Sequence, residues 1–222
     1  MTKDFFLKKS ALFSLFILGA FSVGIYSDVF AVTWVEQTSS GSRNWQDITS
    51  SSDGTKLAAT VQSGYIYTSS DSGATWVQQT GSGSRNWYSI TSSSDGTKLA
   101  AAVYSGGGYI YTSSDSGATW ATSTNAGSRF WTAITSKLAA TVQSGYIYTS
   151  TDSGATWTEQ TSSGLRNWFF MTSSSDGTKL AASPSNGFIY TSSDSGATWA
   201  TSTTAGSRFW TSITSSSDGT KL

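Results

Sequence analysis

The 222-residue chain contains no cysteine and no histidine. Without cysteine it cannot form a disulfide or use a thiol as a nucleophile. Without histidine it cannot build a histidine-dependent catalytic triad, and most zinc and iron sites lose their usual ligand. The sequence therefore predicts no metal site and no cofactor, and a domain whose stability comes from its own core.

Charge is also scarce and balanced, with 13 basic and 13 acidic residues, and only 12% of the residues are charged. This balance argues against a nucleic-acid partner or an anionic membrane held by bulk charge. Proline occurs once, at Pro184. What the chain has in abundance is glycine, serine, threonine and ten tryptophans at regular spacing, and these regular aromatic residues argue against disorder.

The N-terminal segment, residues 1–31, differs in kind from the rest. Three lysines precede an apolar run at residues 11–25, and Ala31 is a small residue of the kind that signal peptidase accepts. We expect residues 1–31 to be a signal peptide cleaved near Ala31, and the mature protein to be exported, either secreted or periplasmic. The alternative is an uncleaved membrane anchor, for which this apolar run is short; the segment would then be the protein's contact with the membrane.

The most informative feature of the sequence is a block of eight residues that occurs four times. It reads Ser-Ser-Asp-Ser-Gly-Ala-Thr-Trp at residues 69–76, 113–120 and 192–199, and at 150–157 Thr151 replaces the second serine. Self-similarity at a fixed period is typical of repeat folds.

The repeat has a period of about 42 residues, which lies in the range of known repeat folds. The tryptophans at the block position, which show this spacing, are Trp34, Trp76, Trp120, Trp157 and Trp199. Two units depart from the period, and both departures have local causes. The longer unit contains three glycines, Gly106 to Gly108, where its neighbours have one. The shorter unit lacks the segment Ser-Ser-Asp-Gly-Thr, so that Ser136 is followed directly by Lys137.

Each unit reads as four short strands. In the first complete unit the strands are expected at residues 44–50, 56–62, 65–68 and 75–80. The pair Asp53-Gly54 after the first strand is a strong hairpin signal, because these residues accept the positive φ angles of a tight turn. Four antiparallel strands in about 42 residues predict the blade of an all-β β-propeller.

The repeats are expected to fill residues 32–222. We expect a fourth strand at residues 33–38 to open the domain and Leu222 to end within a second strand, which makes about four and a half blades. The third strand that would complete the shared blade is absent, so the sequence is expected to be a fragment, truncated within a blade.

The residue types of the block suit a turn between two strands. Asp71 can accept backbone N–H groups, and Gly73 can adopt a backbone conformation that a side chain would forbid. Ser69 and Thr75 can bond across the neck of the turn, and Trp76 can bury its ring between sheets. The equivalent residues of the other copies are Asp115, Gly117, Trp120, Asp152, Gly154, Trp157, Asp194, Gly196 and Trp199. All of these are expected to be structural.

The pattern Ser-x-Asp-x-Gly-x-Thr-Trp resembles the Asp-box, or BNR repeat, of the sialidase-type propeller superfamily. That superfamily includes sialidases, sortilin-type receptors and photosystem II assembly factors. The resemblance implies a β-propeller with its boxes at the periphery of the blades, away from the ligand-binding face. It says little about function, because the superfamily contains both enzymes and binding proteins.

No catalytic residue is assigned. Once the acidic residues of the signal segment, the hairpin turns and the boxes are set aside, Glu36, Asp47 and Glu159 remain. Asp47 has no acidic counterpart in the other units, and Tyr88 and Tyr104 are likewise unmatched. The resemblance implies that a sialidase-like enzyme would need three arginines, a tyrosine nucleophile with a glutamate partner, and an aspartic acid. The Arg-Ile-Pro signature of that family is missing.

One series of residues suggests a ligand site. Arg43, Arg85, Arg129, Arg166 and Arg208 each lie two residues before the first-strand tryptophan of a unit. In a propeller this position lies at the opposite end of the blade from the boxes, so the guanidinium groups could surround the central channel and bind an acidic sugar, a carboxylate or an acidic peptide. The alternative is a structural arginine that stacks on a tryptophan.

Aromatic residues at the start of the first strands offer a second possibility. Tyr88, Phe169 and Phe170 could form a surface for a sugar or peptide, or they could pack between blades. The favoured interpretation is an exported, non-enzymatic propeller that acts as a binding or assembly scaffold for an anionic glycan or an acidic peptide. The alternative is a sialidase-like glycoside hydrolase whose catalytic residues lie outside this sequence.

Overall fold

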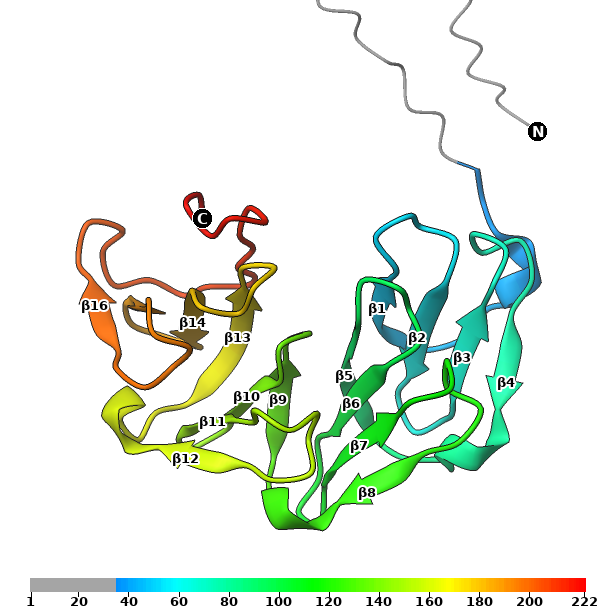
Figure 1. Ribbon diagram of the computed structural model, residues 1–222, viewed down its shortest axis with the longest axis horizontal. Helices are drawn as coiled ribbons and strands as arrows, with labels where there is room; N and C mark the ends of the chain where they lie inside the picture. The colour runs from blue at the N-terminus through cyan, green and yellow to red at the C-terminus, as the bar shows by residue number, and fades with distance from the viewer. Residues whose placement is uncertain (1–34) are drawn as a thin grey trace, which may run out of the picture. The chain divides into compact units, whose positions relative to one another are not determined.

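The structure is a computed structural model that describes residues 35–222, and residues 36–222 form one compact unit. In this unit sixteen strands form four antiparallel sheets of four strands each, which we call blades 1 to 4 (Figure 1). Blade 1 contains β1 (Trp45–Ser50), β2 (Leu57–Val61), β3 (Ile66–Ser69) and β4 (Val77–Gln79). Blade 2 contains β5 (Trp87–Ser92), β6 (Leu99–Val103), β7 (Ile110–Ser113) and β8 (Ala121–Ser123). Blade 3 contains β9 (Trp131–Ile134), β10 (Ala139–Val142), β11 (Ile147–Thr149) and β12 (Thr158–Gln160). Blade 4 contains β13 (Trp168–Ser173), β14 (Leu180–Pro184), β15 (Ile189–Ser192) and β16 (Ala200–Ser202).

Each blade is a simple meander in which every strand pairs with the next one along the chain. The predicted all-β fold with four-stranded blades is confirmed, and the strands of blade 1 lie within the residue ranges expected from the sequence, except that β3 extends to Ser69. Tight turns supply the connections, and their positive φ angles fall mostly on Gly and Ser, such as Gly54 at 72° and Ser72 at 58°, and on none of the described Asp residues.

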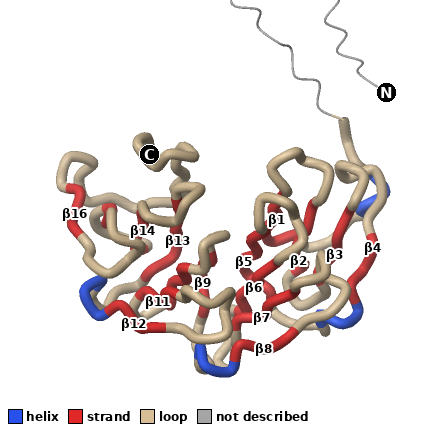
Figure 2. Tube along the Cα trace, viewed as in Figure 1, coloured by secondary structure: helices blue, strands red, loops and turns tan. Residues whose placement is uncertain are grey.

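The first strands of consecutive blades, β1, β5, β9 and β13, lie side by side, and the fourth strands lie on the far side of each blade (Figure 1). Short 3₁₀-helices, which were not expected from the sequence, follow β4, β8 and β12, and another precedes β1, as the blue segments of Figure 2 show. They span Thr38–Ser40, Thr80–Ser82, Thr124–Ala126 and Thr161–Ser163. The buried hydroxyl of Ser82 accepts the Ile66 amide at 3.1 Å and donates to the Gln79 carbonyl at 2.7 Å, so this helical turn is bonded into its blade.

The core lies between blades and is built on the first-strand tryptophans. Trp87, Trp131 and Trp168 are fully buried. Trp87 packs with Ala58 and Ile66 of the preceding blade, and the other two tryptophans pack in the same way at the following junctions. Burying a side chain of this size removes roughly 150–250 Å² from water, so these residues are the largest single contributions to the core.

A β-bulge marks the start of most first strands. In β1 the register with β2 shifts between Trp45 and Asp47, and the same shift occurs between Trp87 and Ser89 and between Trp168 and Phe170. A bulge leaves one residue unpaired and turns its side chain to a new direction.

The prediction of a strand at residues 33–38 was wrong for the part that is described. Residues 35–37 form no strand and Thr38–Ser40 is a 3₁₀-helix. The fourth strand of each described blade pairs with the third strand of the same blade, and none of the described residues supplies such a third strand for this segment.

Residues 203–222 contain no strand, but their turn repeats the earlier hairpins. The Ser216 amide donates to the Lys221 carbonyl at 3.0 Å, as the Ser93 amide does to Lys98 at 2.9 Å. The expected signal peptide, with its cleavage site near Ala31, lies outside the described residues. Within residues 35–222 no helix is long and apolar enough to cross a membrane.

Candidate functional site

The blades have two different ends. The register pairs Ser50 with Leu57 and Leu57 with Ser69, so the hairpin turns and the eight-residue blocks share one end, which we call the box end. The arginines precede the first strands at the other end, where Arg85 forms an isolated bridge with Gly64 of the preceding blade. We call this the arginine end.

The carboxylates at the box end are occupied by turn hydrogen bonds. Asp71 accepts the Thr75 amide at 2.9 Å, the Thr75 hydroxyl at 2.6 Å and the Ser69 hydroxyl at 2.7 Å. These bonds, those from Thr75 above all, lower the pKa of Asp71 to about 2. Asp115, Asp152 and Asp194 make the same set of bonds.

The remaining residues of the block complete the turn. Ser69 Oγ accepts the Gly73 amide at 2.9 Å, and Gly73 has a φ of 91°. The indole nitrogens of Trp120, Trp157 and Trp199 donate to the carbonyls of the block glycines at 2.9 to 3.2 Å. The indole nitrogen of Trp76 is buried with no acceptor among the described residues.

The arginine series lies against aromatic rings within each blade. The guanidinium carbons of Arg43, Arg85, Arg129 and Arg166 lie 4.3 to 4.6 Å from the centroid of the third-strand tyrosine of their own blade. Those of Arg43, Arg85 and Arg166 also lie 5.6 to 5.8 Å from the first-strand tryptophan. Arg208 is exposed and donates through Nε to the Ala205 carbonyl at 2.9 Å.

Arg129 differs from the other members of the series. Arg85 donates through Nη1 to the carbonyl of Ser82 at 2.7 Å, and Arg43 and Arg166 donate to the equivalent carbonyls. Arg129 makes no such bond among the described residues, and its Nε is buried without a partner. Its guanidinium instead lies on the Tyr148 ring and interacts with the Tyr148 hydroxyl.

An aromatic cluster lies beside Arg129 at the arginine end. The rings of Tyr88 and Tyr104 are 5.0 Å apart, and Tyr104 is 5.3 Å from Phe130 in an edge arrangement. Tyr88 is the unpaired residue of the bulge in β5, which explains its direction. The Tyr104 hydroxyl bonds to Gln143 of blade 3, and Phe130 is 42% exposed. We call Tyr88, Tyr104 and Phe130 the aromatic cluster.

The glycine insertion lies beside the cluster. Gly108 is buried and corresponds to Gly64 of blade 1, because its carbonyl accepts the Arg129 amide as that of Gly64 accepts the Arg85 amide. The two extra glycines, Gly106 and Gly107, are exposed, and a Cβ on Gly106 would lie 3.5 Å from the Phe130 ring. The sequence had marked Tyr88 and Tyr104 as unmatched positions, but only the structure places them together with Phe130. Phe169 and Phe170 form a separate pair with centroids 6.2 Å apart.

Asp47 links two blades. Its carboxylate accepts the Ile48 amide at 2.9 Å and the Ile90 amide of blade 2 at 2.8 Å. Burial raises the pKa of Asp47, and the hydrogen bonds act against that increase. Ser89 plays the same part at the next junction, where its hydroxyl accepts the Ile134 amide at 3.3 Å. The carboxylate therefore has a structural partner in the adjoining strand.

The structure reveals one tyrosine–glutamate pair that the sequence analysis missed. The buried Tyr148 hydroxyl donates to Glu159, next to Arg129. Desolvation, and secondly the bond to Glu159, raise the pKa of Tyr148 to about 12. A raised pKa makes the hydroxyl a poorer nucleophile. Tyr67 and Gln78 form the same cross-strand bond in blade 1 at 2.7 Å, so this pair repeats a structural contact.

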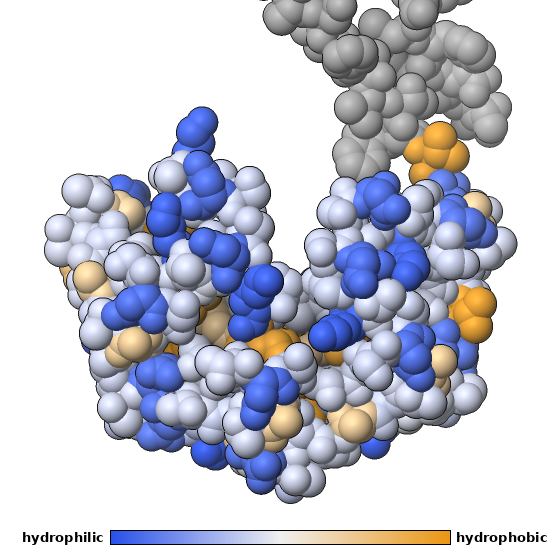
Figure 3. All heavy atoms as spheres, viewed as in Figure 1, coloured by the Kyte–Doolittle hydropathy of each residue, from blue (hydrophilic) through white to orange (hydrophobic). Residues whose placement is uncertain are grey.

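The described residues hold no group of three or more acidic side chains that could bind a metal ion. The face seen in Figure 3 is mostly hydrophilic or neutral, with small hydrophobic areas. The chemistry available at the arginine end is therefore aromatic contact and guanidinium hydrogen bonding, both of which suit recognition.

No protein-family model matches this chain, and no curated protein sequence matches it. Solved structures do resemble its fold. The GH74 enzyme of Niastella koreensis gives a TM-score of 0.54 at 16% identity, over 70% of this chain and 24% of that one. A structure of YCF48 bound to D1 peptide gives 0.56 at 16% identity, over 72% of this chain and 53% of that one. A putative TolB from Agrobacterium tumefaciens gives 0.56 at 19% identity, over 71% and 61%.

These proteins are β-propellers with four-stranded antiparallel blades, and the similarity shows that the present chain shares that fold. The chain spans less than two thirds of each of these structures. The neighbours include both an enzyme and a protein bound to a peptide, so the fold is compatible with either kind of function.

Proposed function

We propose that this chain is a non-enzymatic binding scaffold that recognises an acidic peptide segment of a partner protein at the arginine end of blades 2 and 3. The observation that carries the proposal is the aromatic cluster beside Arg129. It is formed by residues that depart from the repeat, and the fold of a single blade does not require them.

The chemistry of this surface suits a peptide. Tyrosine, phenylalanine and arginine are the residue types that contribute most to protein interfaces, because they combine large contact area with few rotatable bonds. Phe130 offers an exposed ring, and the guanidinium of Arg129 lacks the carbonyl partner that Arg85 and Arg166 have. An acidic side chain next to an apolar one in the ligand would satisfy both groups. The peptide-bound YCF48 structure has the same fold and supports this choice over a glycan.

The proposal includes the assignment of the four blocks as Asp-boxes of the sialidase-type superfamily, with a structural role only. Their carboxylates are all engaged in turn bonds, which supports this role. It also includes export after cleavage near Ala31, which N-terminal sequencing of the mature protein would test: Val32 is the expected first residue, and an intact Met1 would contradict it.

The binding test uses an array of peptides and glycans with the protein at about 100 mM salt, because higher ionic strength screens exposed charges. We expect acidic peptides with an aromatic or aliphatic neighbour to bind. The variant Phe130→Ala should weaken binding about 30-fold, the effect of an interface residue worth about 2 kcal/mol. Phe209→Ala is the matched control, because Phe209 occupies the same repeat position and is 80% exposed; it should leave binding unchanged.

An equal loss of peptide binding in Phe130→Ala and Phe209→Ala, or selective binding of glycans by the wild type, would contradict the proposal. Hydrolysis of a fluorogenic sialoside above background would overturn the non-enzymatic assignment and favour the glycoside hydrolase.

A further inference from the structure

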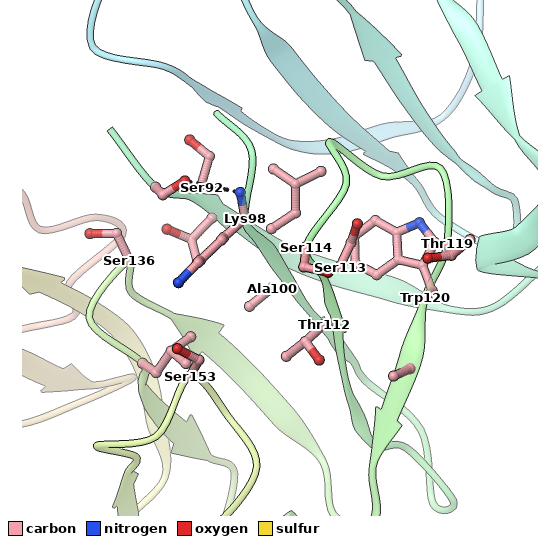
Figure 4. A pocket seen from close by; sticks show the side chains of 15 residues that line it. Ser92, Lys98, Ala100, Thr112, Ser113, Ser114, Thr119, Trp120, Ser136 and Ser153 are labelled. Atoms are coloured by element: carbon pink, nitrogen blue, oxygen red, sulfur yellow. Dashed lines mark hydrogen bonds between the residues drawn. The ribbon is translucent and has the colours of Figure 1, made fainter. Parts of the chain in front are cut away.

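The shortened hairpin of blade 3 leaves a pocket at the box end between blades 2 and 3. It has a volume of about 410 Å³, against about 200 Å³ between blades 1 and 2, about 510 Å³ between blades 3 and 4 and about 330 Å³ beside the last turn, so the missing turn and not the volume distinguishes it. Its lining includes Lys98, Thr112 and Trp120 from blade 2 and Ser136 and Ser153 from blade 3 (Figure 4). This site lies at the opposite end of the blades from the aromatic cluster.

At the other junctions a hairpin turn of the next blade packs on a lysine of the preceding blade. The turn residue Gly96 of blade 2 lies directly over Lys56 of blade 1, since a Cβ there would be 2.8 Å from the Lys56 Cβ. Gly177 covers Lys137 in the same way at the junction of blades 3 and 4, and a glycine of the last turn covers Lys179.

Each filling turn also brings a hydrogen-bond acceptor and a carboxylate. The Ser52 amide of blade 1 donates to the Ser94 carbonyl of the blade 2 turn at 2.8 Å, and the Ser175 amide donates to the Ser217 carbonyl at 2.7 Å. The pKa of Asp95, in the blade 2 turn, is lowered chiefly by the hydroxyl of Ser93, then by the bonds from Thr97, and least by the charge of Lys56. The turn therefore supplies an acceptor for one amide of the preceding blade and places a negative charge near its lysine.

Blade 3 lacks this turn segment, so no turn packs over the corresponding amide and lysine of blade 2. The exposed Ser94 amide and the exposed Lys98 ammonium make no hydrogen bond within residues 35–222, whereas the Ser52 amide has the turn carbonyl as its acceptor. The Lys98 side chain extends toward the side of the pocket where Ser136 and Ser153 lie (Figure 4).

The shortened hairpin is also strained. Leu138 has a φ of 55°, a left-handed conformation that is unfavourable for a residue with a side chain. Lys98 and Ser136 also line a second hollow of about 510 Å³ on the far side of this hairpin, where the further charged residues are Lys137 and Asp176.

We propose that this pocket binds an Asp-Gly turn of a partner protein, which takes the place of the missing hairpin. The aspartate carboxylate of the partner pairs with Lys98, a backbone carbonyl accepts the Ser94 amide, and the turn packs against Trp120 and Leu138. The three complete hairpins that pack on a preceding blade in the same chain show that a Ser-Asp-Gly-Thr segment fits this type of junction.

In the test, the capped peptide Ser-Ser-Asp-Gly-Thr is titrated into the full chain at low salt, and binding is monitored by NMR. We expect saturable shifts of the Ser94 amide and the Trp120 indole. The peptide with Asn in place of Asp should bind about tenfold more weakly, and so should sodium acetate, which lacks a backbone. Acetate binding as tight as the peptide would overturn the proposal in favour of a simple anion site.

Two lysine variants distinguish binding in this pocket from nonspecific electrostatic attraction. Lys98→Ala should weaken peptide binding about tenfold, while Lys56→Ala, whose side chain is already covered by a turn, should leave it unchanged. Insertion of Ser-Ser-Asp-Gly-Thr after Ser136 should fill the pocket and abolish binding without loss of thermal stability. Absence of peptide binding, or binding that both Lys98→Ala and the insertion leave intact, would overturn the proposal.

Discussion

The repeat allows the contribution of one buried tryptophan to be measured against a matched residue in the same chain. Trp87 is fully buried, with its ring 5.2 Å from Tyr111 in an edge arrangement and 6.1 Å from Trp120. Trp45 has the same relation to the tyrosine and the block tryptophan of blade 1, but it is partly exposed, because no other described blade covers that face of blade 1.

The expected cost of Trp87→Ala follows from the area buried. About 200 Å² removed from water corresponds to about 5 kcal/mol, and large-to-small substitutions of buried tryptophan usually cost about 3–5 kcal/mol. We therefore expect Trp87→Ala to lower the free energy of unfolding by about 4 kcal/mol, a large part of the stability of an ordinary domain. For Trp45→Ala, which leaves less of a cavity, we expect about half of that loss.

Urea unfolding followed by far-ultraviolet circular dichroism would measure both changes, since tryptophan fluorescence is altered by the substitutions themselves. A loss below about 1 kcal/mol for Trp87→Ala, or equal losses for the two variants, would refute the idea that the junctions between blades form the core.

Three further predictions follow from the turns and from the link between blades. The turn carboxyl groups whose pKa values are lowered to about 2 stabilise the fold fully above about pH 4. Calorimetry should therefore show the melting temperature falling as the pH approaches 2, and a melting temperature that does not change between about pH 4 and about pH 2 would contradict this. Burial raises the pKa of Asp47 above 3.8, so its stabilising contribution is complete below that pH and is lost as the pH rises through the raised pKa. The melting temperature of Asp47→Asn should therefore rise relative to that of the wild type as the pH increases through this range. A difference in melting temperature that stays constant with pH would contradict the raised pKa of Asp47. Gly96→Ala should destabilise the protein more than Gly54→Ala, because both positions have positive φ but only at Gly96 would the new Cβ meet Lys56; similar melting temperatures for the two variants would show that the turn does not pack on that lysine.

Much of the fold was predictable because the determinants are local and repeated. The Asp53-Gly54 turn, the alternating residues of the third strand and the block at 69–76 each specify their structure within a few residues, and the chain repeats them at a nearly constant period. The expected strand at residues 33–38 was wrong for residues 35–38 for the opposite reason, since a strand needs a partner and none of the described residues supplies one there.

The candidate sites were predictable only in part. The sequence identified Tyr88 and Tyr104 as departures from the repeat, and it located both the glycine insertion and the missing hairpin residues. It could not show that the bulge turns Tyr88 toward Tyr104, or that Phe130 of the next blade completes the cluster. It also left open whether the arginines were free or stacked.

The amino-acid sequence alone therefore determined the period, the four-stranded blade and the structural role expected of the block, since each depends on contacts between residues close in the chain. Only the tertiary structure decided which groups have a partner across a junction. The Ser52 amide donates to the turn of the next blade, whereas the exposed Ser94 amide and Lys98 ammonium bond to no other described residue, because the corresponding turn of blade 3 lacks the segment Ser-Ser-Asp-Gly-Thr. Whether a hydrogen bond or a charge contact forms across a junction depends on two blades together, and for that reason it can be seen only when the blades are packed.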